Sequence, residues 1–141
     1  MARTFTVLDV RRVAYLDLTG SGIETVAHLR ENARIVLMFG AFEGPPKIVR
    51  LHGRGHVVLP EEPGFTDLVH HFSDHPGIRS VIVVDVDRVA ESCGFAVPLM
   101  SYASDRDVLD RSATKKGPKK LAAYRAERNA TSLDGLPGLA P

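Results

Sequence analysis

Residues 17–39 read DLTGSGIETVAHLRENARIVLMF, and this stretch decides how the whole chain is interpreted. It predicts the end of a strand, a glycine-rich turn, a helix and a further strand. Ser21 followed by Glu24 is a capping-box pattern, and apolar residues then recur at helical spacing. We therefore expect a helix over residues 21–32 and a strand over residues 34–39.

The turn Thr19–Gly22 allows two interpretations. It brings hydroxyls and backbone N–H groups to a helix N-terminus, where a phosphate is favoured. It is equally a plain capped turn, because Gly-Ser-Gly is common and the carboxylate of Glu24 opposes an anion. The residues by themselves favour the capped turn.

Composition limits the function classes. A length of 141 residues predicts one domain, spanning residues 1–141, and 44% hydrophobic with 25% charged residues is ordinary for a globular protein. The net charge of +1 gives no general case for nucleic acid or a membrane surface. The start of the chain lacks the apolar stretch of a signal peptide, and no apolar run approaches the ~18 residues of a membrane span. The single cysteine, Cys93, excludes an internal disulfide, so we expect a cytoplasmic protein.

The remaining pattern predicts a mainly β (α+β) fold. Short connections between β-rich runs favour antiparallel pairing, and a small β-barrel with peripheral helices fits best. We expect a helical C-terminal segment from about residue 104 and a mobile tail from about residue 131. Strands are expected at residues 4–8, 13–18, 34–39, 47–59 and 78–89, and further helices at residues 65–72, 104–111 and 121–128.

The strand predicted at residues 47–59 alternates, and one side of it is cationic. Arg50, His52, Arg54 and His56 recur with a period of two and emerge in one row. Such a row either neutralises a phosphate or faces solvent, and the mixture of Arg and His slightly favours a site or an interface. The two glycines within this strand indicate bending.

Two further motifs give weaker evidence for a functional site. His71 and His75 have the spacing of a metal pair on a helix, but Pro76 ends that helix and no further ligand pattern follows, so we predict no metal site. The lysine-rich stretch at residues 115–120 is expected to be a solvated loop, since no aromatic residue interleaves it. No side chain is an evident acid, base or nucleophile, and the catalytic residues stay unknown.

Several stretches together resemble the pyridoxamine 5′-phosphate oxidase-like family of FMN-binding split-barrel proteins. The resemblance implies a six-stranded antiparallel split barrel, a homodimer, and FMN in a cleft between subunits. It also implies that the family's first strands lie before the part matched here, and that the substrate is a small redox molecule. The resemblance rests on VAYLDLTGSG (13–22), TVAHLREN (25–32), RIVLMF (34–39) and IVRLHGRG (48–55), with SCGFAVP (92–98) and AYRAERNATS (123–132) pointing to an uncharacterised bacterial subgroup.

The resemblance also implies which residues hold the cofactor. The family's phosphate corner falls on the turn after the second strand and on the first helical turn. The long strand that follows would run beside the flavin ring. The implied cofactor residues are Thr19, Gly20, Ser21 and Thr25 around the phosphate, with Lys47, Ile48 and Arg50 near the ring.

One departure from the family pattern keeps alternatives open. Members that act as oxidases carry an Arg-Lys pair at the start of this helix, where this chain has Glu24 and Thr25. Two charge-assisted hydrogen bonds to phosphate, at about 1.5–3 kcal/mol each, are thereby missing unless Arg50 or Arg54 compensates. The alternatives are a non-catalytic split-barrel interaction module without FMN and a deazaflavin-dependent reductase. Haem is weaker, since His52 and His56 lie on a strand without another ligand signal.

Overall fold

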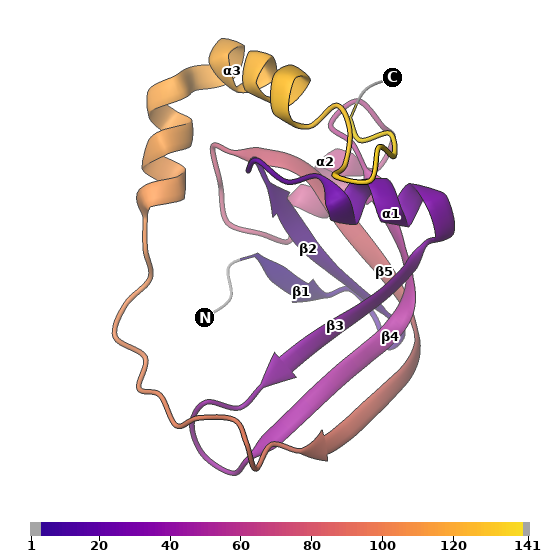
Figure 1. Cartoon of the computed structure of the whole chain (residues 1–141), viewed down its shortest axis with the longest axis vertical. Coiled ribbons are helices and arrows are strands. Elements are labelled where there is room, and N and C mark those ends of the chain that lie inside the picture. Colours follow the sequence, from indigo (N-terminus) through magenta and orange to yellow (C-terminus); the bar gives the residue numbers. More distant parts are fainter. Residues whose placement is uncertain (1–3, 140–141) are drawn as a thin grey trace.

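The computed structural model describes residues 4–139, which fold around one antiparallel sheet (Figure 1). The order of its strands is β1-β2-β5-β4-β3, and each neighbouring pair is antiparallel. This confirms the mainly β, antiparallel fold expected from the sequence. The strands are β1 (Phe5–Val7), β2 (Arg12–Leu18), β3 (Arg34–Gly40), β4 (Lys47–Val58) and β5 (Ile78–Cys93), and the helices are α1 (Glu24–Asn32), α2 (Phe65–Val69) and α3 (Val108–Arg128).

Strand β5 is the centre of the sheet. It pairs with β2 on one side and with β4 on the other, and Val81–Val84 are buried on both faces. A run of β-branched residues suits such a position, because it packs well on both sides of a pleat. The strand continues to Cys93, which pairs with Lys47, whereas the sequence predicted its end near residue 89.

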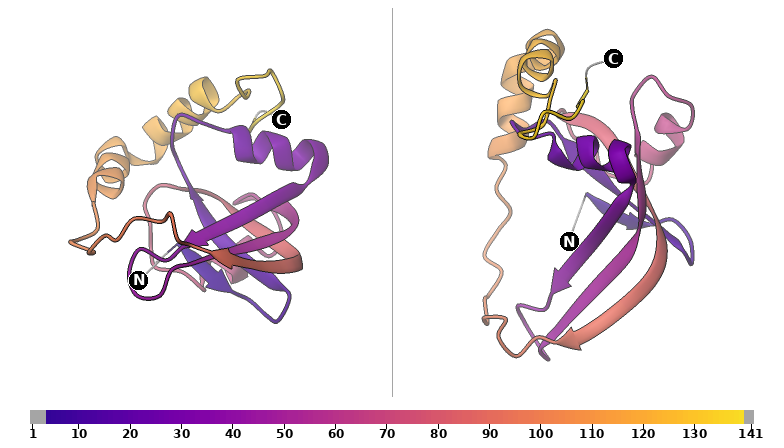
Figure 2. Two further views of the ribbon diagram at one scale, coloured as in Figure 1. Left: turned by 60° about the horizontal axis from the view of Figure 1, so that its bottom comes forward. Right: turned by 45° about the vertical axis from the view of Figure 1, so that its right-hand side comes forward.

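Helices α1 and α2 cover opposite faces of the sheet (Figure 2). Helix α1 buries Val26 and Leu29 against Val84 and its neighbours. On the other face, Phe65 and Leu68 of α2 pack against a second buried cluster. That cluster consists of Ala14, Leu16, Val81 and Val83.

The glycines of β4 lie where the chain bends and where α1 comes close. The register shifts between His52 and Gly53, which leaves Asp87 of β5 without a partner in the ladder. A Cβ atom on Gly53 would lie 2.1 Å from the backbone oxygen of Asp85. A Cβ atom on Gly55 would lie 2.9 Å from Leu29 Cδ2, so α1 sits where it does because Gly55 has no side chain. The bending expected at these glycines is confirmed.

Helix α1 begins later than predicted, and its predicted capping box is absent. The helix starts at Glu24, and Ser21 lies outside it. Glu24 takes over part of the capping role, since its Oε2 accepts a hydrogen bond of 2.9 Å from the backbone N–H of Ile23. The helix ends at Ala33, whose left-handed φ of 61° closes the last turn.

Helix α3 replaces the two short helices and the lysine loop of the prediction. It begins at Val108 rather than near residue 104. The helix is kinked at Gly117, where φ is 69°, just before Pro118. Residues 94–107 form an extended segment that connects the end of β5 to α3 (Figures 1 and 2).

The C-terminal residues lie against α1. Leu139 packs on the cluster beneath α1, and the backbone N–H of Leu133 donates a hydrogen bond of 3.0 Å to Glu24 Oε1. Arg30 donates a hydrogen bond to the carbonyl of Gly138. The mobility of the tail from about residue 131 stays a prediction, as does the division of the chain into domains. Among residues 4–139, no helix is both long and apolar enough to cross a bilayer.

Candidate functional site

The turn between β2 and α1 is fixed by a buried arginine. Arg79 grips Asp17 with two hydrogen bonds, of 2.8 Å from Nε and 2.7 Å from Nη2, and Ser80 Oγ donates a third of 2.7 Å to the same carboxylate. The Nη1 of Arg79 donates to the carbonyl of Gly22 at 2.9 Å. The Arg79 side chain is only 6% exposed, so this pairing neutralises a charge that water does not reach.

A second arginine reaches the turn from α3. Arg125 Nε donates a hydrogen bond of 2.9 Å to Thr19 Oγ1, which itself donates to the carbonyl of Gly77 at 2.9 Å. Asn129 is fully buried, and its Nδ2 donates a hydrogen bond of 3.0 Å to the carbonyl of Gly20. Burial, and then the neighbouring charge of Arg79, lowers the pKa of Arg125.

The backbone N–H group at the start of α1 is already hydrogen-bonded to a carboxylate of the chain itself. The carboxylate of Glu24 accepts from the N–H of Ile23, and its pKa is lowered by its own backbone N–H first and then by that of Leu133. A phosphate at this helix N-terminus would therefore meet a carboxylate rather than open N–H donors. The hydroxyls of Ser21 and Thr25 are exposed beside it.

A small cavity of about 150 Å³ opens between the turn and α3. Thr19 and Gly20 form one side, and Ser112, Lys116 and Tyr124 form the other. Lys116 Nζ donates a hydrogen bond of 2.6 Å to Ser112 Oγ and lies 5.7 Å from the centre of the Tyr124 ring. A cation with hydroxyls suits a small anion, although a whole drug-sized ligand needs at least about 300 Å³. The sequence analysis missed Lys116, because its stretch was expected to be a solvated loop.

Burial also raises the pKa of a tyrosine in the sheet. Tyr15 belongs to β2 and packs against the cluster beneath α1. Desolvation, with a smaller contribution from the charge of Asp17, raises its pKa to about 12. Tyr15 is therefore neutral at physiological pH, and it cannot act as a general base there.

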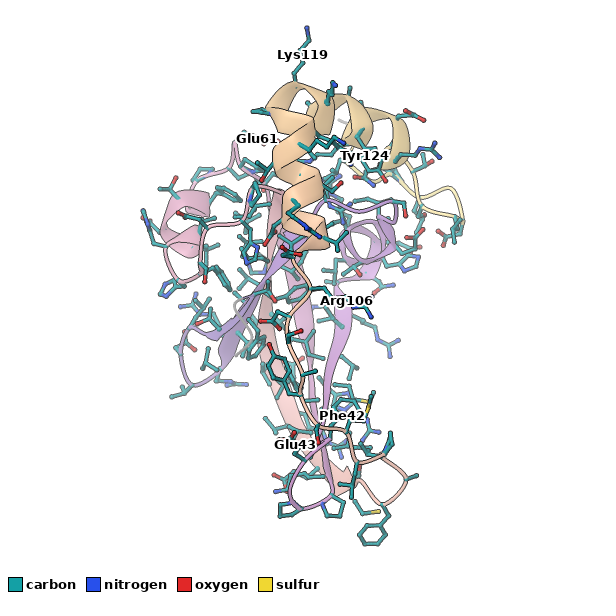
Figure 3. The ribbon with its side chains drawn as sticks, turned by 90° about the vertical axis from the view of Figure 1, so that its left-hand side faces the viewer. Phe42, Glu43, Glu61, Arg106, Lys119 and Tyr124 are labelled. Carbon is teal, nitrogen blue, oxygen red and sulfur yellow. The ribbon has the colours of Figure 1, made fainter. Side chains whose placement is uncertain are left out.

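The residues predicted near the flavin ring lie at the other end of β4. Lys47 Nζ is 3.2 Å from Glu91 Oε2, and Arg50 Nη1 donates 2.8 Å to Ser92 Oγ. Ile48 lies between them and pairs with Ser92. Figure 3 shows Phe42 and Glu43, from the adjoining loop, at the opposite end of the molecule from Tyr124.

The two predicted groups are not brought together within one chain. Leu18, just before the turn, pairs with Ile78, whereas Lys47 pairs with Cys93. These partners lie fifteen residues apart on β5, or about 50 Å along the strand at ~3.3 Å per residue. The structure places Thr19, Gly20, Ser21 and Thr25 at one end, called the turn end below, and Lys47, Ile48 and Arg50 at the other, called the hairpin end.

The cationic row of β4 lies on one face, as predicted, but its members have separate partners. Arg54 Nη2 lies 3.4 Å from the carbonyl of Asn32, and His56 lies 4.0 Å from Asp85. His52 and Arg54 line an open, mixed-charge hollow of about 720 Å³ that also contains Asp87. His52, Arg54 and His56 therefore do not form one cationic site together with Arg50.

The hairpin end leaves large apolar side chains exposed. Phe95 and Leu99 are 82% and 83% exposed, and Phe39, Phe42 and Met100 are also exposed. The segment that carries Phe95, Leu99 and Met100 is held to the β3–β4 loop by two hydrogen bonds. Met100 N–H donates to the carbonyl of Phe42 at 3.0 Å, and Tyr102 N–H donates to Glu43 Oε1 at 3.1 Å. Several large apolar side chains exposed at one end of a molecule are typical of an interface.

One of the histidines near α2 contacts α3. His75 Nδ1 lies 3.0 Å from Asp110 Oδ1 at the start of α3, and the His75 side chain is 11% exposed. His71 and His75 both follow the end of α2, which stops at Val69. Among residues 4–139, no group of three or more His, Cys, Asp or Glu side chains is arranged to hold a metal ion.

Comparison with known proteins places this arrangement in a family. The chain is 37% identical over 151 aligned residues to the pyridoxamine 5′-phosphate oxidase family protein ustO of Aspergillus flavus, an alignment that covers 96% of the chain. The chain belongs to the pyridoxamine 5′-phosphate oxidase family. It spans 61% of the length of that fungal relative. No family model matches the chain.

A crystal structure of HupZ from Group A Streptococcus has a similar fold. It superposes with a TM-score of 0.50 and 16% identity, over 63% of this chain and 73% of the HupZ chain. At this identity the likeness concerns the fold alone. It supports the antiparallel sheet expected for this member of the pyridoxamine 5′-phosphate oxidase family.

Proposed function

We propose that the chain is an FMN-binding oxidoreductase of small-molecule substrates, with a cofactor site completed by a second copy. One observation carries the proposal. The two groups of residues expected to hold the cofactor lie about 50 Å apart along β5, while the hairpin end exposes an apolar surface. A homodimer that covers this surface could bring the turn end of one copy to the hairpin end of the other.

The residues fit a flavin phosphate in part. Ser21 and Thr25 supply hydroxyls and Lys116 supplies a cation, but the N–H of Ile23 is taken by Glu24. In the proposal, these side chains bind the phosphate, and Arg50 orients the ring from the partner's hairpin end. When bound, the flavin itself supplies the redox chemistry. The single cysteine suits a reducing compartment, and the cytoplasm is the proposed location.

The first test is the absorbance spectrum of the purified protein, followed by titration of the FMN-free protein with FMN. A yellow protein or saturable micromolar quenching of flavin fluorescence is expected. Ser21→Asp should weaken binding by about tenfold or more, because it places a negative charge beside the phosphate. Ser73→Asp is the matched control, since Ser73 is exposed and belongs to neither group of residues.

A mixing experiment tests whether the site is shared. Ser21→Asp and Arg50→Ala, each expected to lose FMN separately, are unfolded together and refolded as a mixture. Random pairing would restore about a quarter of the FMN sites, because each hybrid dimer has one intact site. The absence of any recovery would show that both groups act within one copy, or that the site lies elsewhere.

A second candidate is an interaction module without flavin. The observation that favours it is the carboxylate of Glu24, which occupies the anion position at the start of α1. A colourless protein that ignores FMN, in both wild type and Glu24→Arg, would select this candidate. Binding of a deazaflavin but not FMN in the same titration would select a deazaflavin-dependent reductase instead.

A further inference from the structure

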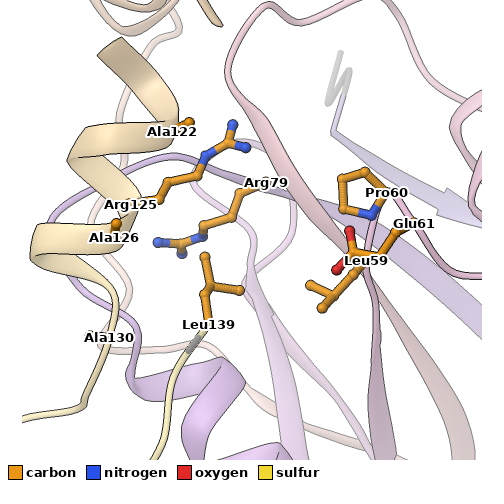
Figure 4. A pocket seen from close by; sticks show the side chains of 9 residues that line it. All are labelled: Leu59, Pro60, Glu61, Arg79, Ala122, Arg125, Ala126, Ala130 and Leu139. Atoms are coloured by element: carbon orange, nitrogen blue, oxygen red, sulfur yellow. The ribbon is translucent and has the colours of Figure 1, made fainter. Parts of the chain in front are cut away.

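A cavity of about 480 Å³ lies between α3 and the connection from β4 to α2 (Figure 4). We propose that this cavity binds an organic monocarboxylate with an apolar body, separately from the flavin. Its size is within the usual range of about 300–1,000 Å³ for small-molecule sites. None of the seven residues expected to hold FMN lines it.

Most of the cavity wall is apolar and contributed by distant parts of the chain. Small alanines from α3 leave the space open on one side, and Leu59 and Pro60 face them across the cavity in Figure 4. An alkyl or aryl group of a ligand would be removed from water here at about 25 cal/mol per Å² of apolar area. The apolar wall is formed by Leu59, Pro60, Ala122, Ala126, Ala130 and Leu139.

Two guanidinium groups line the same cavity, and only one is neutralised. Arg79 is paired with Asp17. Arg125 makes no ion pair with a carboxylate among residues 4–139, and its hydrogen bonds go to the hydroxyl of Thr19 and the carbonyl of Ile78. This half-buried charge is the unsatisfied electrostatic feature of the cavity, and an anion would relieve it.

The geometry of Arg125 favours a carboxylate. Its Nε and Nη2 are engaged, while Nη1 donates no hydrogen bond recorded within residues 4–139. The remaining Nη1 can donate a charge-assisted hydrogen bond to a carboxylate oxygen. Glu61 also lines the cavity and opposes an anion, but it is exposed, so water and salt weaken its charge. Arg125 is therefore the charge of the cavity that a ligand carboxylate would neutralise, against a screened opposition from Glu61.

Calorimetric titration of the FMN-free protein with octanoate tests the proposal, with 1-octanol as the neutral probe of the same chain length. Octanoate should bind at least about tenfold more tightly than octanol, because the carboxylate adds a charge-assisted contact with Arg125. Glu61→Gln should tighten octanoate binding by about twofold, since it removes a screened opposing charge.

A matched pair of helix variants checks the location. Ala126→Leu adds bulk to the cavity wall and should weaken octanoate by about tenfold or more, whereas Ala123→Leu, one helix position away from the wall residue Ala122, should leave it unchanged. Both alanines are exposed, so neither change disturbs a packed core. Circular dichroism would verify that both variants fold alike.

The proposal would be overturned by the absence of octanoate binding, by equal binding of octanol, or by an Ala126→Leu variant that binds octanoate like wild type. Displacement of octanoate by FMN would also overturn it, because the cavity would then belong to the flavin site. Failure of the protein to bind FMN has no bearing on this result, since the titration is made without flavin.

Discussion

The turn end and the hairpin end share β4 and β5 but differ in how completely the chain covers them. At the turn end, Arg79, Arg125 and Asn129 connect α3 and the C-terminal residues to one short loop. At the hairpin end, Phe95 and Leu99 are more than four-fifths exposed. One end is therefore stabilised by contacts within the chain, whereas the other leaves large apolar side chains exposed to solvent.

Removal of the Asp17 side chain should give the largest loss of stability, because Asp17 forms the buried ion pair of the turn end. Asp17→Ala leaves Arg79 charged and buried without its anionic partner, and should lower the free energy of unfolding by about 3–5 kcal/mol. Urea denaturation measures it. The control is Glu91→Ala at the hairpin end, whose exposed pair with Lys47 should contribute less than about 1 kcal/mol.

Similar losses in the two variants would refute the contrast between a buried and an exposed ion pair. If Asp17→Ala fails to fold, Asp17→Asn provides the measurement, because it keeps an oxygen that accepts from Ser80. Its loss should lie between those of the other two variants.

The hairpin end should respond through association rather than folding. Phe95→Asp should weaken a dimer by more than about 2 kcal/mol, or ~30-fold, if Phe95 lies near the centre of the interface. Sedimentation equilibrium measures the change. Leu133→Asp is the matched control at the turn end, where Leu133 is 96% exposed. A wild-type chain that is monomeric at micromolar concentration would remove the basis for the shared site.

The bend between the two ends depends on Gly53. Gly53→Ala should destabilise the fold by about 1–3 kcal/mol, because its Cβ would lie 2.1 Å from the backbone oxygen of Asp85. In Gly40→Ala the nearest atom is Val97 Cγ1 at 3.9 Å, and the change should stay within about 0.5 kcal/mol. Thermal unfolding compares the two, and equal stabilities would show that the bulge yields at no cost.

Replacement of Glu24 should change the stability least, and the change should depend on pH. Its pKa is lowered in the folded protein, so its stabilisation is present above the ordinary value of 4.5 and is lost as the pH falls through the lower folded-state pKa. The difference in unfolding free energy between wild type and Glu24→Gln should therefore favour wild type at pH 7 and shrink in acid. A difference that is independent of pH would show that the carboxylate charge plays no part.

Local patterns predicted most of the strands and α1. The alternation of β4 and the β-branched run of β5 are readable because each strand presents its faces with a period of two. Helix starts were less accurate, since Ser21 does not cap α1 and α3 was expected to begin near residue 104 but begins at Val108. In each case the helix begins a few residues later in the chain.

The candidate site was located only in part. The turn Thr19–Gly22 stands out in the sequence because of its glycines and hydroxyls, but the groups that hold it come from Arg79, Arg125 and Asn129. These residues lie about sixty to more than one hundred positions away, and no local pattern connects them with the turn. Lys116 was missed because its stretch was expected to be a solvated loop rather than part of α3.

The sequence by itself determined the order of strands and helices along the chain, the buried run of β5 and the family. Side-chain periodicity and glycine positions encode these features locally. Tertiary structure alone decided that Glu24 occupies the helix N-terminus, that the two groups of cofactor residues lie at opposite ends of β5, and that Arg125 enters an apolar cavity. Those outcomes depend on which distant segments meet when the sheet bends, and they are settled only when the whole chain packs.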